Sequence, residues 1–299
     1  MKNYFSLIKF SHTIFAMPFA LIGFFLGTQY ALVHQLRFSA NCLQINPYVY
    51  LSLLVVLCMV FARSAAMAFN RYLDYQIDAR NPRTAIREIP AGKISPNKAL
   101  AFTIICALLF ILCTFFINTL CFYLSFVALF VILFYSYTKR FTALCHLVLG
   151  LGLSLAPIGA FLAVTGRFQW LPLLFSLVVF TWVSGFDIIY ALQDEEFDKS
   201  NQLYSIPAFL GKQKALWVSN VLHMITAFLI VVIGINFLST FWYWIGAVIF
   251  MAMLWFQHRL VKPNDLSKVN IAFMTANGIA SVVFAFFVII HLIIQINKI

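Results

Sequence analysis

Nine apolar runs, separated by polar segments, constrain the fold of this chain more than any other feature. A helix needs roughly 20 apolar residues to cross the hydrocarbon core of a bilayer. On that basis the runs cover residues 14–32, 49–70, 99–118, 120–137, 144–164, 170–192, 215–235, 241–256 and 271–294. With 63% hydrophobic and 10% charged residues in 299, the composition is that of a polytopic membrane protein. The sequence therefore predicts an all-α membrane protein with nine transmembrane helices in a single domain, residues 1–299.

The third and fourth runs are nearly continuous over residues 99–137. One helix over both would be roughly 58 Å long, about twice the hydrocarbon thickness. We therefore expect a turn at Asn118-Thr119 to separate them. In the first run, the pattern Gly23-x-x-x-Gly27 is typical of close helix packing.

The basic residues predict the orientation of the chain. If the N-terminus is cytoplasmic, only Arg37, Arg167 and Lys298 of the 20 Lys and Arg lie outside. Because basic residues concentrate in cytoplasmic loops, this orientation is strongly favoured over the reverse. It places all nine acidic residues on the cytoplasmic side.

Eight of the nine acidic residues lie in two segments, and each segment contains an acidic stripe. Asn70, Asp74 and Asp78 are spaced i, i+4, i+8, so on a helix they lie on one face. A second copy, with Asp194 and Asp198, follows 120 positions later at matching residues. The polar loops after the two stripes also resemble each other, each with an Ile-Pro followed by a Gly-Lys. The sequence therefore predicts an internal duplication, with the first four spans repeated as the next four and a ninth appended.

Carboxylate and amide oxygens are the ligands that Mg²⁺ prefers, and it commonly bridges one or two carboxylates to substrate phosphates. If the two stripes face one another across a cavity, they could hold two ions on one diphosphate and neutralise a leaving group. Asp187 lies on the same helical face as the second stripe.

Basic residues near the stripes are candidates to grip the phosphates. The candidates are Arg71, Arg80, Arg83, Arg87, Lys139, Arg140 and Lys199. Positive-inside topology explains Arg80 and Lys199 better when each is taken singly. Lys139-Arg140, at the end of the fourth span, forms a better clamp because the fork of an Arg matches phosphate oxygens.

Arg63 lies seven residues before Asn70, on the same face and roughly 10 Å deeper in the span. An intramembrane Arg costs at least about 2.5 kcal/mol unless it is paired, so a functional role is the first hypothesis. An Asp or an acidic substrate would each pair with it, and pairing within the bundle is the structural alternative.

These motifs resemble those of the UbiA superfamily of intramembrane aromatic prenyltransferases, over essentially the whole chain. The resemblance is carried by Arg63 with Asn70-x-x-x-Asp74-x-x-x-Asp78, by Asp187-x-x-Tyr190-Ala-x-Gln-Asp194-x-x-x-Asp198, and by Tyr135-Ser-Tyr-Thr-Lys139-Arg140-Phe-Thr. The second and third stretches look like the branch that contains the 4-hydroxybenzoate polyprenyltransferases.

The resemblance implies two four-helix halves plus one helix around a central cavity open to the cytoplasmic side. It implies a Mg²⁺-dependent enzyme that ionises a polyprenyl diphosphate to an allylic carbocation, which the ring of an aromatic acid then attacks. By position, the residues implied are Asn70, Asp74, Asp194 and Asp198, with Asp78 supporting, for Mg²⁺-diphosphate; Lys139, Arg140 and Arg71 for the diphosphate; Tyr190 beside it; and Asp187 and Arg63 toward the acceptor or the reacting end of the prenyl chain.

The resemblance leaves the acceptor open between two hydroxylated aromatic acids. We expect 4-hydroxybenzoate, as in ubiquinone biosynthesis. However, Lys9-Phe-Ser11-His12-Thr13 stands where the 4-hydroxybenzoate enzymes usually carry an Asp-Lys-Pro-like element. It looks more like relatives that prenylate a dihydroxynaphthoate in menaquinone biosynthesis. The location implied is a bacterial inner membrane, with the N-terminus and active site cytoplasmic, membrane lipid as a partner and no nucleic acid.

A cation transporter is the alternative from another functional class, since acidic stripes in a repeated fold could carry ions. The predicted carboxylates lie at the ends of spans rather than near the midplane. Neither half has a Pro- or Gly-broken span at a matching place. The sequence therefore favours the enzyme.

Overall fold

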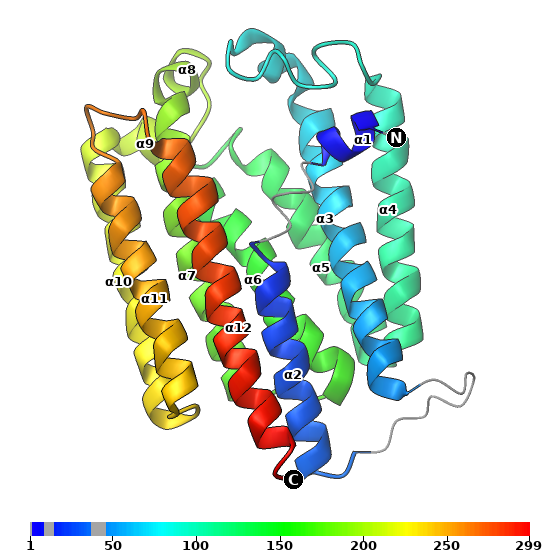
Figure 1. The fold of residues 1–299 in the computed structure, drawn as a ribbon. Helices are drawn as coiled ribbons and strands as arrows, with labels where there is room; N and C mark the ends of the chain where they lie inside the picture. Colours follow the sequence, from blue (N-terminus) through cyan, green and yellow to red (C-terminus); the bar gives the residue numbers. More distant parts are fainter. Residues whose placement is uncertain (1, 9–14, 37–45) are drawn as a thin grey trace.

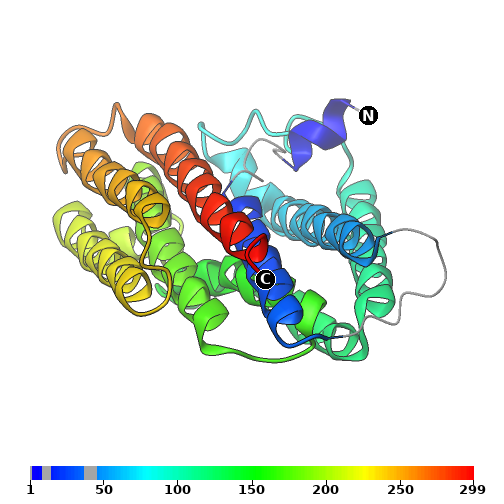
Figure 2. The ribbon, with the colours of Figure 1, turned by 60° about the horizontal axis from the view of Figure 1, so that its bottom comes forward.

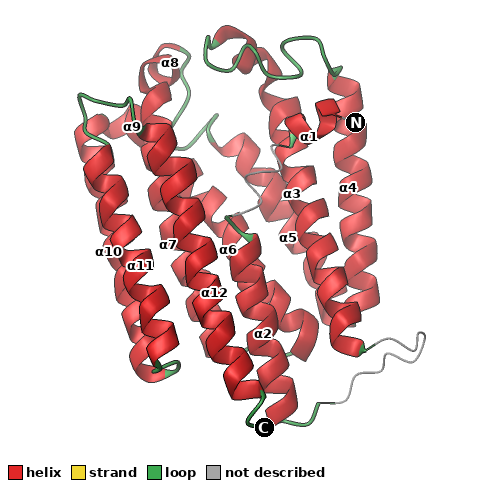
Figure 3. Ribbon diagram, in the orientation of Figure 1, coloured by secondary structure: helices red, strands yellow, loops and turns green. Residues whose placement is uncertain are grey.

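The computed structural model describes residues 2–8, 15–36 and 46–299, and every regular element in this part of the chain is helical (Figures 1 and 3). The long helices are α2 (Met17–Val33), α3 (Pro47–Arg80), α4 (Pro96–Ile117), α5 (Thr119–Thr138), α6 (Cys145–Thr165), α7 (Trp170–Ala191), α10 (Lys212–Asn236), α11 (Phe241–Leu260) and α12 (Asn277–Ile296). Three short helices lie outside them: α1 (Lys2–Leu7), α8 (Glu195–Ser200) and α9 (Ile206–Leu210).

Within the described residues, eight helical stretches are long and apolar enough to cross a membrane, which confirms the predicted all-helical membrane protein. They correspond to the second to ninth predicted runs. The first run corresponds to α2, an apolar helix of 17 residues that is shorter than a full span. The predicted start of that run at Ile14 lies outside the described residues.

The predicted turn between the third and fourth runs is confirmed at Asn118. Helix α4 ends at Ile117 and α5 begins at Thr119. The Asn118 Oδ1 accepts a hydrogen bond from the Cys121 amide (2.8 Å), and its Nδ2 donates to the Leu162 carbonyl (2.9 Å). Asn is a good N-cap because its short side chain can satisfy an amide of the first turn, which has no partner within the helix.

The order of elements is the order that the predicted duplication requires. Helices α2–α5 are followed by α6, α7, α10 and α11, with α12 last. A polar loop follows the second helix of each half, residues 81–95 in the first half and the segment with α8 and α9 in the second. Both loops lie at one end of the bundle, opposite the C-terminus (Figure 1).

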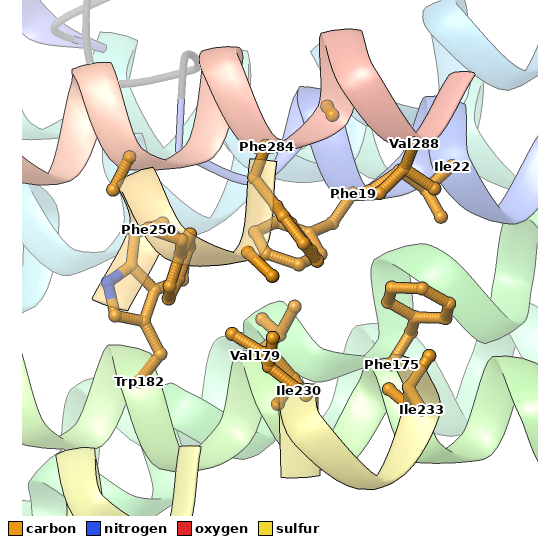
Figure 4. Packing of buried hydrophobic residues seen from close by; sticks show 14 of the residues in the cluster. Phe19, Ile22, Phe175, Val179, Trp182, Ile230, Ile233, Phe250, Phe284 and Val288 are labelled. Atoms are coloured by element: carbon orange, nitrogen blue, oxygen red, sulfur yellow. The ribbon is translucent and has the colours of Figure 1, made fainter. Parts of the chain in front are cut away.

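Aromatic side chains from α2, α7, α11 and α12 fill the largest core of the bundle (Figure 4). The rings of Phe19, Trp182, Phe250 and Phe284 are fully buried, and the centroids of neighbouring rings lie 5.2 to 5.4 Å apart along the pairs Phe19–Trp182–Phe250–Phe284. Such tilted and edge-to-face pairs add roughly 0.5–1.5 kcal/mol each to the burial itself. This core holds α12 against α2, as Figure 2 also shows.

Helices α2 and α6 pack closely at the two glycines of the first run. A Cβ on Gly23 would lie 2.0 Å from the Pro157 carbonyl oxygen, and one on Gly27 would lie 2.9 Å from the Val164 Cβ. Small residues allow such approach where lipid provides no hydrophobic force between helices. The packing role predicted for Gly23 and Gly27 is confirmed.

Two predicted helices are irregular near the polar loops. The run predicted to end at residue 192 changes to a 3₁₀ turn at Leu192–Asp194 before α8, and the last run begins with a π-helical turn at Ile271–Ala276. Asn277, which is fully buried, accounts for the second change. Its Nδ2 donates to the carbonyls of Ala272 and Phe273 at 3.1 and 3.0 Å, and its Oδ1 accepts from the Trp182 Nε1 at 2.8 Å.

Candidate functional site

A polar cavity of about 280 Å³ lies between the two acidic stripes at the loop end of the bundle. The predicted site residues in its wall are Arg63, Asn70, Arg71, Asp74, Asp78, Lys139, Asp187, Tyr190, Asp194 and Asp198. The structure therefore brings both stripes to one cavity, as predicted. Arg140 is the one predicted residue that is not part of this wall.

The first stripe lies on a single regular helix, because α3 continues without interruption to Arg80. Asp74, which is 1% exposed, is paired with two cations from the end of α5. The Lys139 Nζ lies 2.6 Å from its Oδ2, and the Arg140 Nη2 lies 2.9 Å from its Oδ1. Arg140 also donates to the carbonyls of Leu73 (3.0 Å) and Ser136 (2.8 Å). Arg140 thus joins α5 to α3 behind the cavity, whereas Lys139 faces into it.

A second ion pair holds the end of the same stripe. The Arg87 Nη1 donates to both carboxylate oxygens of Asp78, at 2.7 and 2.8 Å. Arg87 follows Asp78 by nine residues and lies in the first polar loop, so this pair also folds the loop back over the helix end. It leaves Asp78 neutralised by a group that also lines the cavity.

Arg71, also in this wall, differs from Lys139 and Arg87 in forming no ion pair with a carboxylate of the stripe. Its residue is only 3% exposed, yet its Nε and Nη1 have no hydrogen-bond partner among the described residues. Burying guanidinium N–H groups without hydrogen-bond partners is unfavourable, and an anionic ligand in the cavity would complete the hydrogen bonding of Arg71. The position of Arg71 fits the predicted role of binding the anionic end of a substrate.

The second stripe is held by a residue of the first half. Arg83, from the loop after α3, donates from Nε to the Asp194 Oδ1 (3.0 Å) and forms a further short bond from Nη2 to Oδ2. Its Nη1 donates to the Tyr190 hydroxyl at 2.8 Å. Burial lowers the pKa of Arg83, but the bonds to Asp194 and Tyr190 outweigh this effect and raise the pKa above its ordinary value. This contact joins the halves across 111 positions of sequence.

The other two acids of the second half have polar partners of their own. Asp198 accepts a hydrogen bond from the Ser205 hydroxyl at 2.9 Å. The Asp187 Oδ2 lies 2.7 Å from the Nδ1 of His146 at the start of α6. His146 lines the cavity too.

The sequence motifs do not identify His146 as a site residue. They include Arg83 and Arg87 among the basic candidates but do not indicate which carboxylate either residue pairs with. For His146, the available signal is its position in the sequence. His146 lies shortly after the Lys139-Arg140 pair, at the start of the next span. Its pairing with Asp187 depends on the packing of α6 against α7, which no local pattern encodes.

Two basic residues lie away from the cavity, which agrees with the prediction that positive-inside topology explains them. Arg80 is exposed, and the Lys199 Nζ pairs with the Glu195 Oε1 at 2.6 Å within α8. Neither lines the polar cavity.

A second cavity, of about 330 Å³ and almost wholly apolar, extends from the first between α3, α5 and α6. The residues common to both cavities are Arg63, Met67, Tyr135, Leu149 and Leu153. Arg63 therefore stands at the junction, and its buried Nε has no hydrogen-bond partner among the described residues. The two cavities together combine a charged mouth with an apolar chamber.

The donors in the polar cavity fit a magnesium ion held jointly with a substrate. Asn70, Asp74, Asp78, Asp194 and Asp198 supply only oxygen atoms, which Mg²⁺ prefers. No group of three or more His, Cys, Asp or Glu among the described residues is close enough to hold a metal unaided. Mg²⁺ often binds through one or two carboxylates, with phosphates and water completing its shell, so this spacing suits substrate-bridged ions.

Comparison with known proteins identifies the family. The model of the UbiA prenyltransferase family matches residues 16–279, most of the chain. The chain belongs to this family. It is 27% identical over 229 residues to a 4-hydroxybenzoate octaprenyltransferase of Vibrio campbellii, covering 76% of this chain and 80% of that protein. It is 28% identical over 247 residues to one from Aeromonas hydrophila, covering 82% and 85%.

Solved structures of UbiA homologues share the fold. The apo structure of a homologue from Aeropyrum pernix matches with a TM-score of 0.76 at 26% identity, over 96% of this chain and 98% of that one. A homologue from Archaeoglobus fulgidus bound to GPP and Mg²⁺ matches with a TM-score of 0.74 at 20% identity, over 97% and 99%. This UbiA-family protein is thus a membrane-embedded member with the fold of its relatives throughout.

Proposed function

We propose that this protein transfers a polyprenyl group from a polyprenyl diphosphate to an aromatic acid in a reaction that depends on Mg²⁺. The first expected acceptor is 4-hydroxybenzoate, and the family membership supports the transferase class. The curated relatives are named 4-hydroxybenzoate octaprenyltransferases, which supports this acceptor and a place in quinone biosynthesis.

One observation carries the proposal: two acidic stripes from different halves line a single polar cavity that continues into an apolar one. The cross-half pair Arg83–Asp194 holds the stripes around that cavity. A polyprenyl diphosphate has the matching chemistry, with an anionic head and an apolar tail. The unpaired guanidinium of Arg71 supports binding of the head.

The acidic residues would hold Mg²⁺ on the diphosphate, and the ion would neutralise charge on the leaving group. The basic residues of the wall would bind phosphate oxygens directly, Arg71 and Lys139 from inside the cavity and Arg83 and Arg87 from the first loop. Lys139 and Arg87 now neutralise carboxylates, so a bound diphosphate and its ions would exchange these partners.

The chemical step would take place at the junction of the two cavities. The bond between the allylic carbon and the diphosphate oxygen breaks, and its electron pair leaves with the diphosphate. A ring carbon of the acceptor forms the new bond to the allylic carbon and loses its proton to a base. Asp187, which lines the polar cavity, would take that proton, and Arg63 would bind the carboxylate of the acceptor.

The apolar cavity would receive the polyprenyl chain and exclude water from the carbocation. Water that reached the carbocation would convert it to an alcohol, so a dry chamber protects the productive reaction. The face of Tyr190, with the ring of Phe273 at 4.2 Å, would add aromatic stabilisation of positive charge.

The cavity would open to the cytoplasmic side of a bacterial inner membrane. The proposal is supported by the basic residues, because the end that carries both polar loops is the end that positive-inside topology assigns to the cytoplasm (Figure 1).

In the experiment, membranes that contain the protein are incubated with a polyprenyl diphosphate, Mg²⁺ and either 4-hydroxybenzoate or a dihydroxynaphthoate. The products are then identified by mass spectrometry. We expect a prenylated 4-hydroxybenzoate, which is lost on chelation of Mg²⁺. Prenylation of the naphthoate alone would assign the protein to the alternative acceptor. The Lys9–Thr13 stretch that suggests that alternative lies outside the described residues. Cation flux in proteoliposomes without any prenyl donor, and no prenylated product, would support the transporter instead.

A further inference from the structure

His146, at the start of α6, contacts two other elements of the second half, α7 and α9. Its residue is 4% exposed, and its Nδ1 lies 2.7 Å from the Oδ2 of Asp187 on α7, a side chain that keeps 21% of its surface open to the cavity. On the other side of the ring, Nε2 lies 3.4 Å from the Ile206 amide at the start of α9. Because an amide donates, Nε2 accepts, and the proton of the neutral imidazole is then on Nδ1, directed at Asp187.

The segment around Ile206 connects this contact to the acidic stripe. The neighbouring Ser205 donates its hydroxyl proton to Asp198 at 2.9 Å, and the Tyr204 amide donates to the Lys139 carbonyl at 2.8 Å. Residues 204–206 are thus fastened at three successive positions to the end of α5, to the second stripe and to His146. The imidazole is the link between this segment and Asp187.

We propose that His146 is a positioning residue that fixes the carboxylate of Asp187 and docks the segment 204–206 against the cavity. It acts through Asp187 and Ile206, and it does not itself exchange a proton with the substrate. One carboxylate oxygen of Asp187 is engaged by Nδ1, so the other is left to face the acceptor. The inference rests on the proposed prenyl transfer for its kinetic readout.

The chemistry of the side chain provides a sharp test. Gln offers a carbonyl oxygen and an amide N–H₂, so His146→Gln can accept from Ile206 and donate to Asp187 in the same way as the imidazole. His146→Leu fills similar space but can do neither. If His146 acts by position, Gln replaces it. If the imidazole takes up a proton during the reaction, Gln cannot.

The kinetic experiment compares both variants with wild type and with His291→Leu. His291 is a matched control because it is 5% exposed and bonded to Thr240 at 2.8 Å, near the C-terminal end of α12. We expect His146→Leu to lower kcat by about 10- to 100-fold, the loss of a hydrogen bond to a charged group, with KM for the prenyl diphosphate unchanged. We expect His146→Gln and His291→Leu to retain kcat. Equal impairment of both His146 variants, or full activity of His146→Leu, would overturn the proposal.

Hydrogen–deuterium exchange provides a readout that does not depend on turnover. In detergent without substrate, His146→Leu should exchange the amides of residues 204–208 faster than wild type, whereas His146→Gln and His291→Leu should not. Unchanged protection in His146→Leu would overturn the docking role. If the wild type shows no prenyl transfer, the proposed function fails, and this measurement still decides whether His146 docks the segment.

Discussion

The two acidic stripes have the same spacing in the sequence but are held in different ways. The first lies on one unbroken helix, α3, and its carboxylates are neutralised by cations: Lys139 and Arg140 on Asp74, and Arg87 on Asp78. The second runs through a 3₁₀ turn into α8, and only Asp194 has a cation, which comes from the first half.

This difference shows that the cations paired with the two stripes come from the first half. In the second half, Asp198 is bonded to a serine and Asp187 to a histidine. On the proposed function, substrate binding would exchange ion pairs at Asp74, Asp78 and Asp194, whereas at Asp198 it would add to a hydrogen bond already formed. The duplicated pattern fixes where the carboxylates lie, and the different loops and neighbours of each half determine what each carboxylate binds.

The largest effects should follow from removing one acid of each stripe. On the proposed function, we expect Asp74→Asn and Asp194→Asn each to lower turnover by about 10²- to 10³-fold or more, since each would remove charge that holds the metal-bound leaving group. Asp265→Asn, an exposed carboxylate in the loop after α11, is the control. If either stripe variant keeps wild-type turnover, one stripe is sufficient, and the prediction that both stripes are needed is wrong.

The unpaired cation gives the next largest effect. Arg71→Met should weaken binding of a prenyl diphosphate by about 10- to 100-fold, because a charge-assisted hydrogen bond is lost. It should also raise the Tm of the substrate-free protein, since an unpaired buried charge is removed. Arg140→Met is the contrasting variant. It removes a cation that is paired with Asp74, so it should lower the Tm. If Arg71→Met lowers the Tm as well, Arg71 has a structural partner and not a vacant anion site.

A smaller effect distinguishes the cations of the two stripes. Arg83 uses all three guanidinium nitrogens on Asp194 and Tyr190, and a lysine cannot reproduce that fork. Arg87 reaches Asp78 through a single nitrogen, which a lysine can imitate. We expect Arg83→Lys to lower the unfolding free energy by about 1–2 kcal/mol and Arg87→Lys to have less effect, as seen in melting temperatures in detergent. Equal losses would contradict this account of the cross-half contact.

The smallest effect is expected at the cations outside the cavity. Lys199→Ala breaks a partly exposed i,i+4 pair with Glu195, which stabilises by about 0.3–0.5 kcal/mol. Turnover should therefore stay at the wild-type level in Lys199→Ala and in Arg80→Ala. A clear loss of turnover in Lys199→Ala would show that a cation outside the cavity wall contributes to the second stripe, and a loss in Arg80→Ala would show the same for the first.

Much of this arrangement could be predicted because it depends on local sequence patterns, namely the lengths of apolar runs and the spacing of polar residues. Apolar run lengths gave the long helices, the excess length of two runs required the break at Asn118, and the i, i+4, i+8 spacing put Asn70, Asp74 and Asp78 on one face. The duplication then indicated that the second stripe would meet the first.

What could not be predicted depends on contacts between distant elements. Arg83 and Asp194 are 111 positions apart, and nothing near either residue distinguishes Arg83 from Arg80. The π-helical turn deviates from a regular helix where the buried Asn277 donates to the carbonyls of Ala272 and Phe273. Arg140 could not be separated from Lys139 by sequence, since they are adjacent and only the packing of α5 on α3 turns one toward the cavity.

The central claim is that the two stripes bind one diphosphate together, and a double-mutant cycle tests it most directly. The measurement is the affinity of the purified protein for an unreactive prenyl diphosphate analogue with Mg²⁺, in wild type, Asp74→Asn, Asp194→Asn and the double variant. If both carboxylates act on one ligand, each single variant loses most of the affinity and the double variant loses little more. Independent losses that add fully in the double variant, or full affinity in one of the single variants, would contradict the account.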